Sequence, residues 1–121
     1  MKPPKYKVSE LEGNWLDAAV ALAEGMSVHN INGEFYVSYQ AGDEGEELAP
    51  HFSSSWNLAG PIIEREWICI DPEGTHVVAH HQWTAIKDDA INRNWHTGRT
   101  PLIAAMRAYV ESKFGDEVQL P

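Results

Sequence analysis

The segment "TPLIAAMRAYVESKFG", residues 100–115, carries the clearest helix pattern in the chain. Thr100 is a residue type that caps helices, and Pro101 suits the first helical position, where its missing N–H leaves no partner unsatisfied. Apolar residues then recur at helical spacing: Leu102, Ile103, Met106, Tyr109 and Val110. Gly115 is placed to end the helix. The segment predicts a C-terminal helix of roughly 14 residues with one apolar face.

A second helix is predicted near the N-terminus. Ser9 and Glu12 have the spacing of a capping box, in which each side chain bonds a backbone N–H of the other end of the first turn. Gly25 is placed to end this helix. Gly13, a poor helix former, lies in its first turn, so the sequence does not fix the residue at which the helix begins. The apolar residues at helical spacing are Leu11, Trp15, Ala19 and Leu22.

Strand patterns fill much of the sequence between the two helices. "MSVHNI" (26–31) and "FYVSY" (35–39) flank Asn32-Gly33, a dipeptide that favours a tight hairpin turn. "WICI" (67–70) and "HVVAHHQWTAI" (76–86) predict two more strands, joined by a turn at "DPEG" (71–74). The polar segments 40–50 and 87–99 are predicted as loops.

The order helix, strands, helix predicts an α+β fold, with a small, mainly antiparallel sheet and the N-terminal and C-terminal helices packed on it. The chain has 121 residues, of which 43% are hydrophobic, so it can bury a core. We expect residues 1–121 to form a single domain.

The charge and the cysteine content indicate which classes of partner and which cellular compartment to expect. The formal net charge is −9, which disfavours direct nucleic-acid binding and contact with anionic membranes. No apolar run approaches the ~20 residues of a membrane helix, and "MKPPKYKVSE" lacks the apolar core of a signal peptide. The single cysteine, Cys69, lies in an apolar run and is interpreted as a structural thiol. We therefore expect a cytoplasmic protein.

The segment "SWNLAGPIIEREW", residues 55–67, is the best candidate for a functional surface. The dipeptide Gly60-Pro61 predicts a turn that starts a short helix, although one continuous strand over 62–70 is the alternative. Charged and aromatic side chains gather at this helix start, so we expect it to bind a ligand or partner. The candidate binding residues are Trp56, Gly60, Pro61, Glu64, Arg65, Glu66, Trp83 and Trp95.

The patterns of known catalytic and metal sites are weak. His76 and His80 share a strand face but lie about 13 Å apart, too far for one zinc ion. Glu64 and Glu66 could act as paired carboxylates, but only on a strand would they share a face. No hydrolase elbow, phosphate loop or dinucleotide fingerprint occurs. We therefore predict no catalytic residue, no metal and no cofactor.

Four segments of the chain resemble the NinX-like family of small proteins from lambdoid and related phages and prophages. "GPIIERE" (60–66) and "TPLIAAMRAYVESKFGDEV" (100–118) are the most specific, and "KVSELEG" (7–13) and "LDAAVALAEG" (16–25) support them. The family pattern has a glycine after "IERE", where this chain has Trp67. The resemblance implies a phage or prophage origin and expression in the bacterial host cell, and it supplies no catalytic residues.

Three functional hypotheses follow. The first is a phage or prophage accessory protein that binds an unknown host or phage protein without catalysis, and that can also form a homo-oligomer. The second is a small-ligand protein that holds a nucleotide-like molecule in a Trp-rich cleft. The third, and weakest, is a hydrolase that uses Glu64, Glu66 and a histidine.

Overall fold

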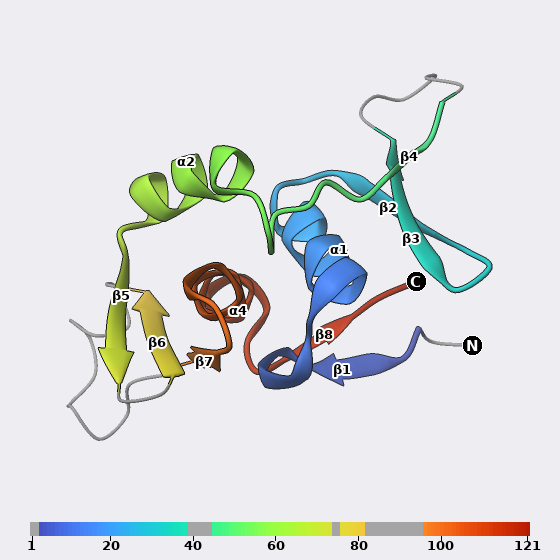
Figure 1. Cartoon of the computed structure of the whole chain (residues 1–121). Coiled ribbons are helices and arrows are strands. Elements are labelled where there is room, and N and C mark those ends of the chain that lie inside the picture. The colour runs from blue at the N-terminus through green and yellow to red at the C-terminus, as the bar shows by residue number, and fades with distance from the viewer. Residues whose placement is uncertain (1–2, 39–44, 74–75, 82–95) are drawn as a thin grey trace.

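The computed structural model describes residues 3–38, 45–73, 76–81 and 96–121 (Figure 1). At positions 72, 73, 76–78, 80 and 81 it describes only the backbone. The elements, in chain order, are β1 (Lys5–Lys7), η1 (Val8–Glu10), α1 (Gly13–Ala23), β2 (Ser27–Ile31), β3 (Glu34–Ser38), β4 (Glu47–Leu48), α2 (Trp56–Glu66), β5 (Ile68–Glu73), β6 (His76–His81), β7 (His96–Gly98), α4 (Pro101–Phe114) and β8 (Glu117–Gln119).

Helix α4 lies at the centre of the molecule (Figure 1). Helices α1 and α2 pack against it, and the sheet of β5, β6 and β7 covers another side. Every residue from Leu102 to Val110 is buried. The predicted C-terminal helix is confirmed, but the prediction of a single apolar face was too narrow, because a helix enclosed by other elements is buried all round.

The strands that the structure describes form three small antiparallel sheets, with the orders β1-β8, β2-β3-β4 and β5-β6-β7. The α+β class and the antiparallel pairing are therefore confirmed. The single sheet that we expected is replaced by three, and α2 is a full third helix. Helix α4 supplies the surface that joins the separate sheets, since it contacts strands of both β5-β6-β7 and β1-β8.

One helix cap and one hairpin turn were predicted correctly. The Thr100 side chain accepts a hydrogen bond from the Ile103 N–H at 3.1 Å, so it caps α4 as predicted. Asn32 and Gly33 connect β2 to β3 with φ values of 54° and 90°, the left-handed geometry of the predicted tight hairpin.

The capping box predicted at Ser9 and Glu12 does not form. Residues 8–10 make a short 3-10 helix, and α1 begins only at Gly13, with Glu12 as an N-cap that makes no side-chain cap bond. The reason lies in Leu11, whose backbone is extended and whose side chain is buried in the core. A helix cannot continue through that extended residue.

The turn predicted at Gly60-Pro61 is also wrong, because both residues lie inside helix α2. Proline in a helix interior costs about 3 kcal/mol. The burial of Ala59 and Ile62 on either side of the dipeptide offsets this cost. The alternative of one strand over 62–70 is excluded for the same reason, since only Ile68 onward is strand.

Four short strands were not predicted, and the end of a fifth strand was misplaced. The strand β5 continues through Pro72 to Glu73, so no turn forms within "DPEG"; β5 is an edge strand, where proline is tolerated. The predicted loops contain β4 and β7, and β1 pairs with β8 near the two chain ends. Strands of two or three residues are too short to show an alternating pattern.

Within the part of the chain that the structure describes, no helix combines the length and apolar character that a membrane crossing requires.

Gly98 marks the closest approach between β7 and α4. A Cβ atom at this position would lie 2.6 Å from the Ala104 backbone nitrogen, so any larger residue must push the strand from the helix. We expect Gly98→Ala to lower the free energy of unfolding by about 2–3 kcal/mol in urea denaturation.

Gly60→Ala is the matched control for this substitution. No atom lies within 4 Å of a Cβ built at Gly60, which sits inside a helix. Alanine there should leave stability unchanged or raise it by up to about 1 kcal/mol. Equal stabilities of Gly98→Ala and the natural chain would contradict the packing described here.

Candidate functional site

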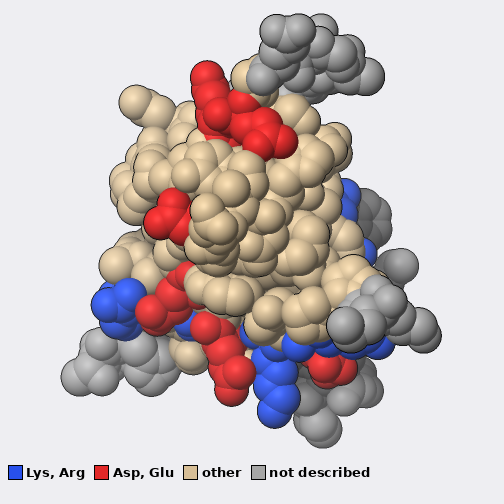
Figure 2. Space-filling view, turned by 90° about the vertical axis from the view of Figure 1, so that its right-hand side faces the viewer, with Lys and Arg blue, Asp and Glu red and all other residues tan. Residues whose placement is uncertain are grey.

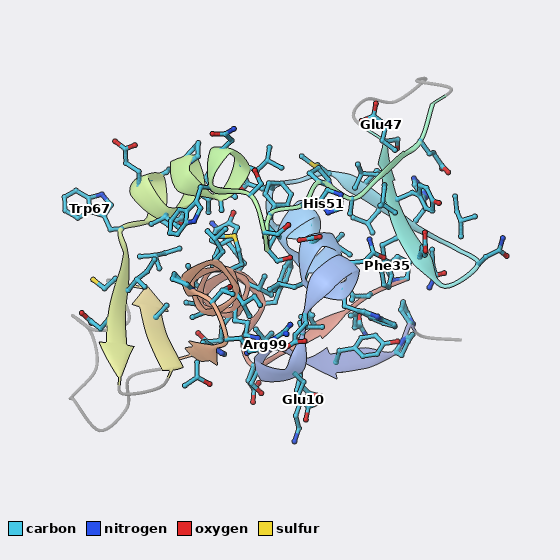
Figure 3. The ribbon with its side chains drawn as sticks, viewed as in Figure 1. Glu10, Phe35, Glu47, His51, Trp67 and Arg99 are labelled. Carbon is cyan, nitrogen blue, oxygen red and sulfur yellow. The ribbon has the colours of Figure 1, made fainter. Side chains whose placement is uncertain are left out.

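Helix α2 carries six of the eight predicted binding residues, and the other two, Trp83 and Trp95, lie outside the described residues. Trp56 begins the helix with 56% of its surface exposed. Just beyond the last turn, Trp67 is 67% exposed and projects away from the body of the molecule (Figure 3). Both tryptophans, which could have been core residues, therefore face solvent.

A depression that is widely open to solvent lies at the C-terminal end of α2. Its lining comes from the second half of the helix and the start of β5: Pro61, Ile63, Glu64, Arg65, Trp67 and Ile68. The structure thus brings together Pro61, Glu64 and Arg65 of the predicted set. It leaves Trp56, Gly60 and Glu66 out of the lining.

Trp67 has the least expected backbone on this helix. It occupies the C-cap position with φ 54° and ψ 50°, the left-handed region in which helices commonly end. Glycine adopts this conformation freely, whereas other residues pay roughly 1 kcal/mol or more. The resemblance noted in the sequence implied a glycine here, so the tryptophan at this position was the available sequence signal, and the predicted site residues did not include Trp67.

Arg65 joins α2 to the other two helices. Its Nη1 and Nη2 atoms donate to the two Glu24 carboxylate oxygens at 3.2 and 2.7 Å, and its Nη2 also donates to the Tyr109 hydroxyl at 3.1 Å. Its Nε donates to Glu66 at 2.9 Å, which forms a local ion pair within α2. Tyr109 in turn donates to Glu24, so the network is closed.

The pKa shifts of Glu24, Tyr109 and Arg65 agree with this hydrogen-bond network. Burial favours a higher pKa for Glu24, but hydrogen bonds from Arg65 and Tyr109 outweigh it, so the pKa of this carboxyl is lowered. Burial and the neighbouring Glu24 raise the pKa of the Tyr109 hydroxyl, which stays a donor at neutral pH. The hydrogen bonds to Glu24 and Glu66 raise the pKa of Arg65. The guanidinium of Arg65 is thus a fixed charge that positions α2.

The two glutamates of the hydrolase hypothesis do not converge. Residues two apart on a helix point about 200° away from each other, and the Glu66 carboxylate is directed to Arg65. Glu64 is exposed at the depression.

The histidines with described side chains lie in separate environments. His29 is near Ser27, Ser38 and Glu46 in the β2–β3–β4 region. His51 Nδ1 lies 3.8 Å from the buried Asp17 carboxylate. Burial and the charge of Arg107 lower the pKa of His96 to about 4. Over the side chains that the structure describes, no three metal-ligating groups come close enough to hold an ion.

Substitution of Arg65 tests the hydrogen-bond and ion-pair network between the helices. Because this side chain is about half exposed, solvent screens its ion pairs, and we expect Arg65→Ala to fold with a loss of about 1–2 kcal/mol in urea denaturation. The neighbouring Glu64→Ala should change stability by less than about 0.5 kcal/mol. A failure of Arg65→Ala to fold, or an unchanged stability, would contradict this reading of the network.

Comparison with known proteins agrees with the resemblance seen in the sequence. The family model described as "Bacteriophage P22, NinX" matches residues 7–113, which include the described elements from η1 to β7 and all of α4 except its last residue. A search of the curated proteins finds no match. The chain therefore belongs to the NinX family of bacteriophage P22.

Proposed function

We propose that this chain is a phage accessory protein that acts in the cytoplasm of the bacterial host by binding a host or phage protein, without catalysis. We further propose that it docks through the C-terminal end of α2, where Trp67 stands beside the depression that Glu64 and Arg65 line. Membership of a phage family supports the first part.

The observation that carries the proposal is the combination of strain and exposure at Trp67. A left-handed backbone at a non-glycine residue costs stability, and an indole that is 67% exposed recovers little of that cost by burial. Because the Trp67 side chain contributes so little to the stability of the folded chain, we propose that it contacts a partner instead. Tryptophan is the residue type most enriched among the side chains that dominate binding energy at protein interfaces.

The shape of the surface favours a protein partner over a small molecule at this position. Small-molecule sites are concave and bury most of the ligand, whereas this depression is widely open to solvent. Its mixture of an exposed aromatic residue, apolar side chains and an arginine is typical of the central part of a protein interface. The net charge of −9 favours a partner with a basic surface.

Trp67→Gly separates binding from folding. Glycine suits the left-handed backbone, so this variant should be as stable as the natural chain or more stable by about 1 kcal/mol. We expect it to lose the partner that the tagged natural chain retains from lysates of infected or lysogenic host cells. The partner is identified by mass spectrometry, and its affinity for both chains is then measured with purified proteins; a loss of tenfold or more is expected.

Phe114→Ser is the matched control, because Phe114 is also an exposed aromatic residue but ends α4 instead of α2. It should retain the partner. Equal affinity of Trp67→Gly and the natural chain, or no specific partner in any such lysate, would overturn the proposal.

A further inference from the structure

The surface at the C-terminal end of α2 carries more negative than positive charge. The Arg65 guanidinium already pairs with the carboxylates of Glu24 and Glu66, at 2.7 and 2.9 Å. The lowered pKa of Glu24 keeps that carboxylate ionised at neutral pH. Glu64 adds a third carboxylate, which is exposed and lines the depression. Three carboxylates therefore surround one guanidinium, and the surface attracts cations.

Glu64 is the carboxylate of this surface that a partner can reach. Within the described part of the chain, its side chain makes no hydrogen bond and no ion pair. The Arg65 guanidinium is engaged elsewhere, by the network that positions α2. Lys113 lies over the Tyr109 ring, 5.8 Å from its centroid, and does not line the depression. The charge of Glu64 is therefore not neutralised by either of these two basic side chains.

Trp67 supplies an open aromatic face at the same depression. Its backbone N–H donates to the Glu64 carbonyl at 3.4 Å, so the two residues belong to the same last turn, and both line the depression. The indole is 67% exposed, and among the described residues no other ring packs against it. Tryptophan is the aromatic side chain that attracts cations most strongly through its ring face. An indole and a carboxylate at one depression can therefore act on the same cationic side chain.

The basic side chains on another side of the molecule do not change this local charge. Figure 2 shows the side that faces right in Figure 1, and the basic side chains seen there gather near its lower end. Trp67 projects from the opposite side of the molecule (Figure 3). Exposed charges are largely screened beyond about 8 Å at physiological ionic strength. The carboxylates near Trp67 therefore decide which charge the depression attracts.

We infer that the depression beside Trp67 receives an arginine side chain of the partner protein, with its guanidinium against the indole and paired with the Glu64 carboxylate. The apolar part of the lining, which is formed by Pro61, Ile63 and Ile68, suits the methylene groups of that side chain. A planar guanidinium can stack on an aromatic ring and bond a carboxylate through two N–H groups, which a lysine ammonium cannot. This inference rests on the docking role proposed for Trp67 and names the chemistry that the partner presents.

The peptide acetyl-Gly-Arg-Gly-amide tests this contact without the partner, and the same peptide with citrulline in place of arginine is its uncharged isostere. In nuclear magnetic resonance titrations up to about 50 mM, we expect the arginine peptide to shift the Trp67 indole N–H and the amides of residues 64–67 in a saturable manner. The Trp67 indole signal is identified by its absence from the spectrum of Trp67→Gly. The citrulline peptide should bind at least about fivefold more weakly.

Glu64→Gln should weaken binding of the arginine peptide at least about fivefold and leave the weak binding of the citrulline peptide unchanged, which a merely structural effect would not do. Glu47→Gln is the matched control. It makes the same change in net charge at an exposed residue of β4, on the opposite side of the molecule from Trp67 (Figure 3). This variant should bind the arginine peptide like the natural chain.

The inference is overturned if the arginine peptide causes no saturable shift of the Trp67 indole N–H, if both peptides bind equally, or if Glu64→Gln binds the arginine peptide with unchanged affinity. The docking role of Trp67 fails through a different observation, which is that Trp67→Gly retains the partner from the lysate. Failure of this inference can therefore be told apart from failure of the docking role.

Discussion

A buried guanidinium on the central helix α4 ties the segment before α1 and the strand β7 to that helix. Arg107 is 7% exposed and sits within the apolar run of α4. Its Nε donates to the Leu11 carbonyl at 2.9 Å, and its Nη1 donates to the Thr97 carbonyl at 2.6 Å. Burial lowers its pKa, and Glu12 opposes that effect. An arginine stays charged in proteins, so its donors must be satisfied inside the molecule.

That requirement constrains the chain on both sides of α4. It holds the segment before α1 against the middle of the helix, and it holds β7 where Gly98 can approach the first helical turn. The same positioning brings the Glu12 carboxylate within 3.4 Å of the Arg107 guanidinium. The Arg65 network positions α2 against α4 in a similar way, but the Arg65 side chain is about half exposed to solvent.

Sequence reasoning succeeded where the information was local. The cap at Thr100 and the hairpin at Asn32-Gly33 depend on residue types and backbone preferences within a few positions, and both were predicted. It failed where distant contacts decide the outcome. Pro61 stays inside a helix because its neighbours are buried. Arg107 was not singled out from the sequence, because its partners lie 96 and 10 residues away. Of the residues that line the depression at the end of α2, the sequence prediction included Glu64 and Arg65 and left out Trp67.

The measurement that tests the central claim most directly is the free energy of unfolding of Arg107→Met in urea. Methionine has a similar length and no charge, so it fills the space but removes the donors to the carbonyls of Leu11 and Thr97. The account predicts a loss of about 3 kcal/mol or more, and a partial recovery for Arg107→Lys. A variant that is as stable as the natural chain would show that apolar packing alone holds α4 in place, and would contradict the organising role assigned to this buried charge.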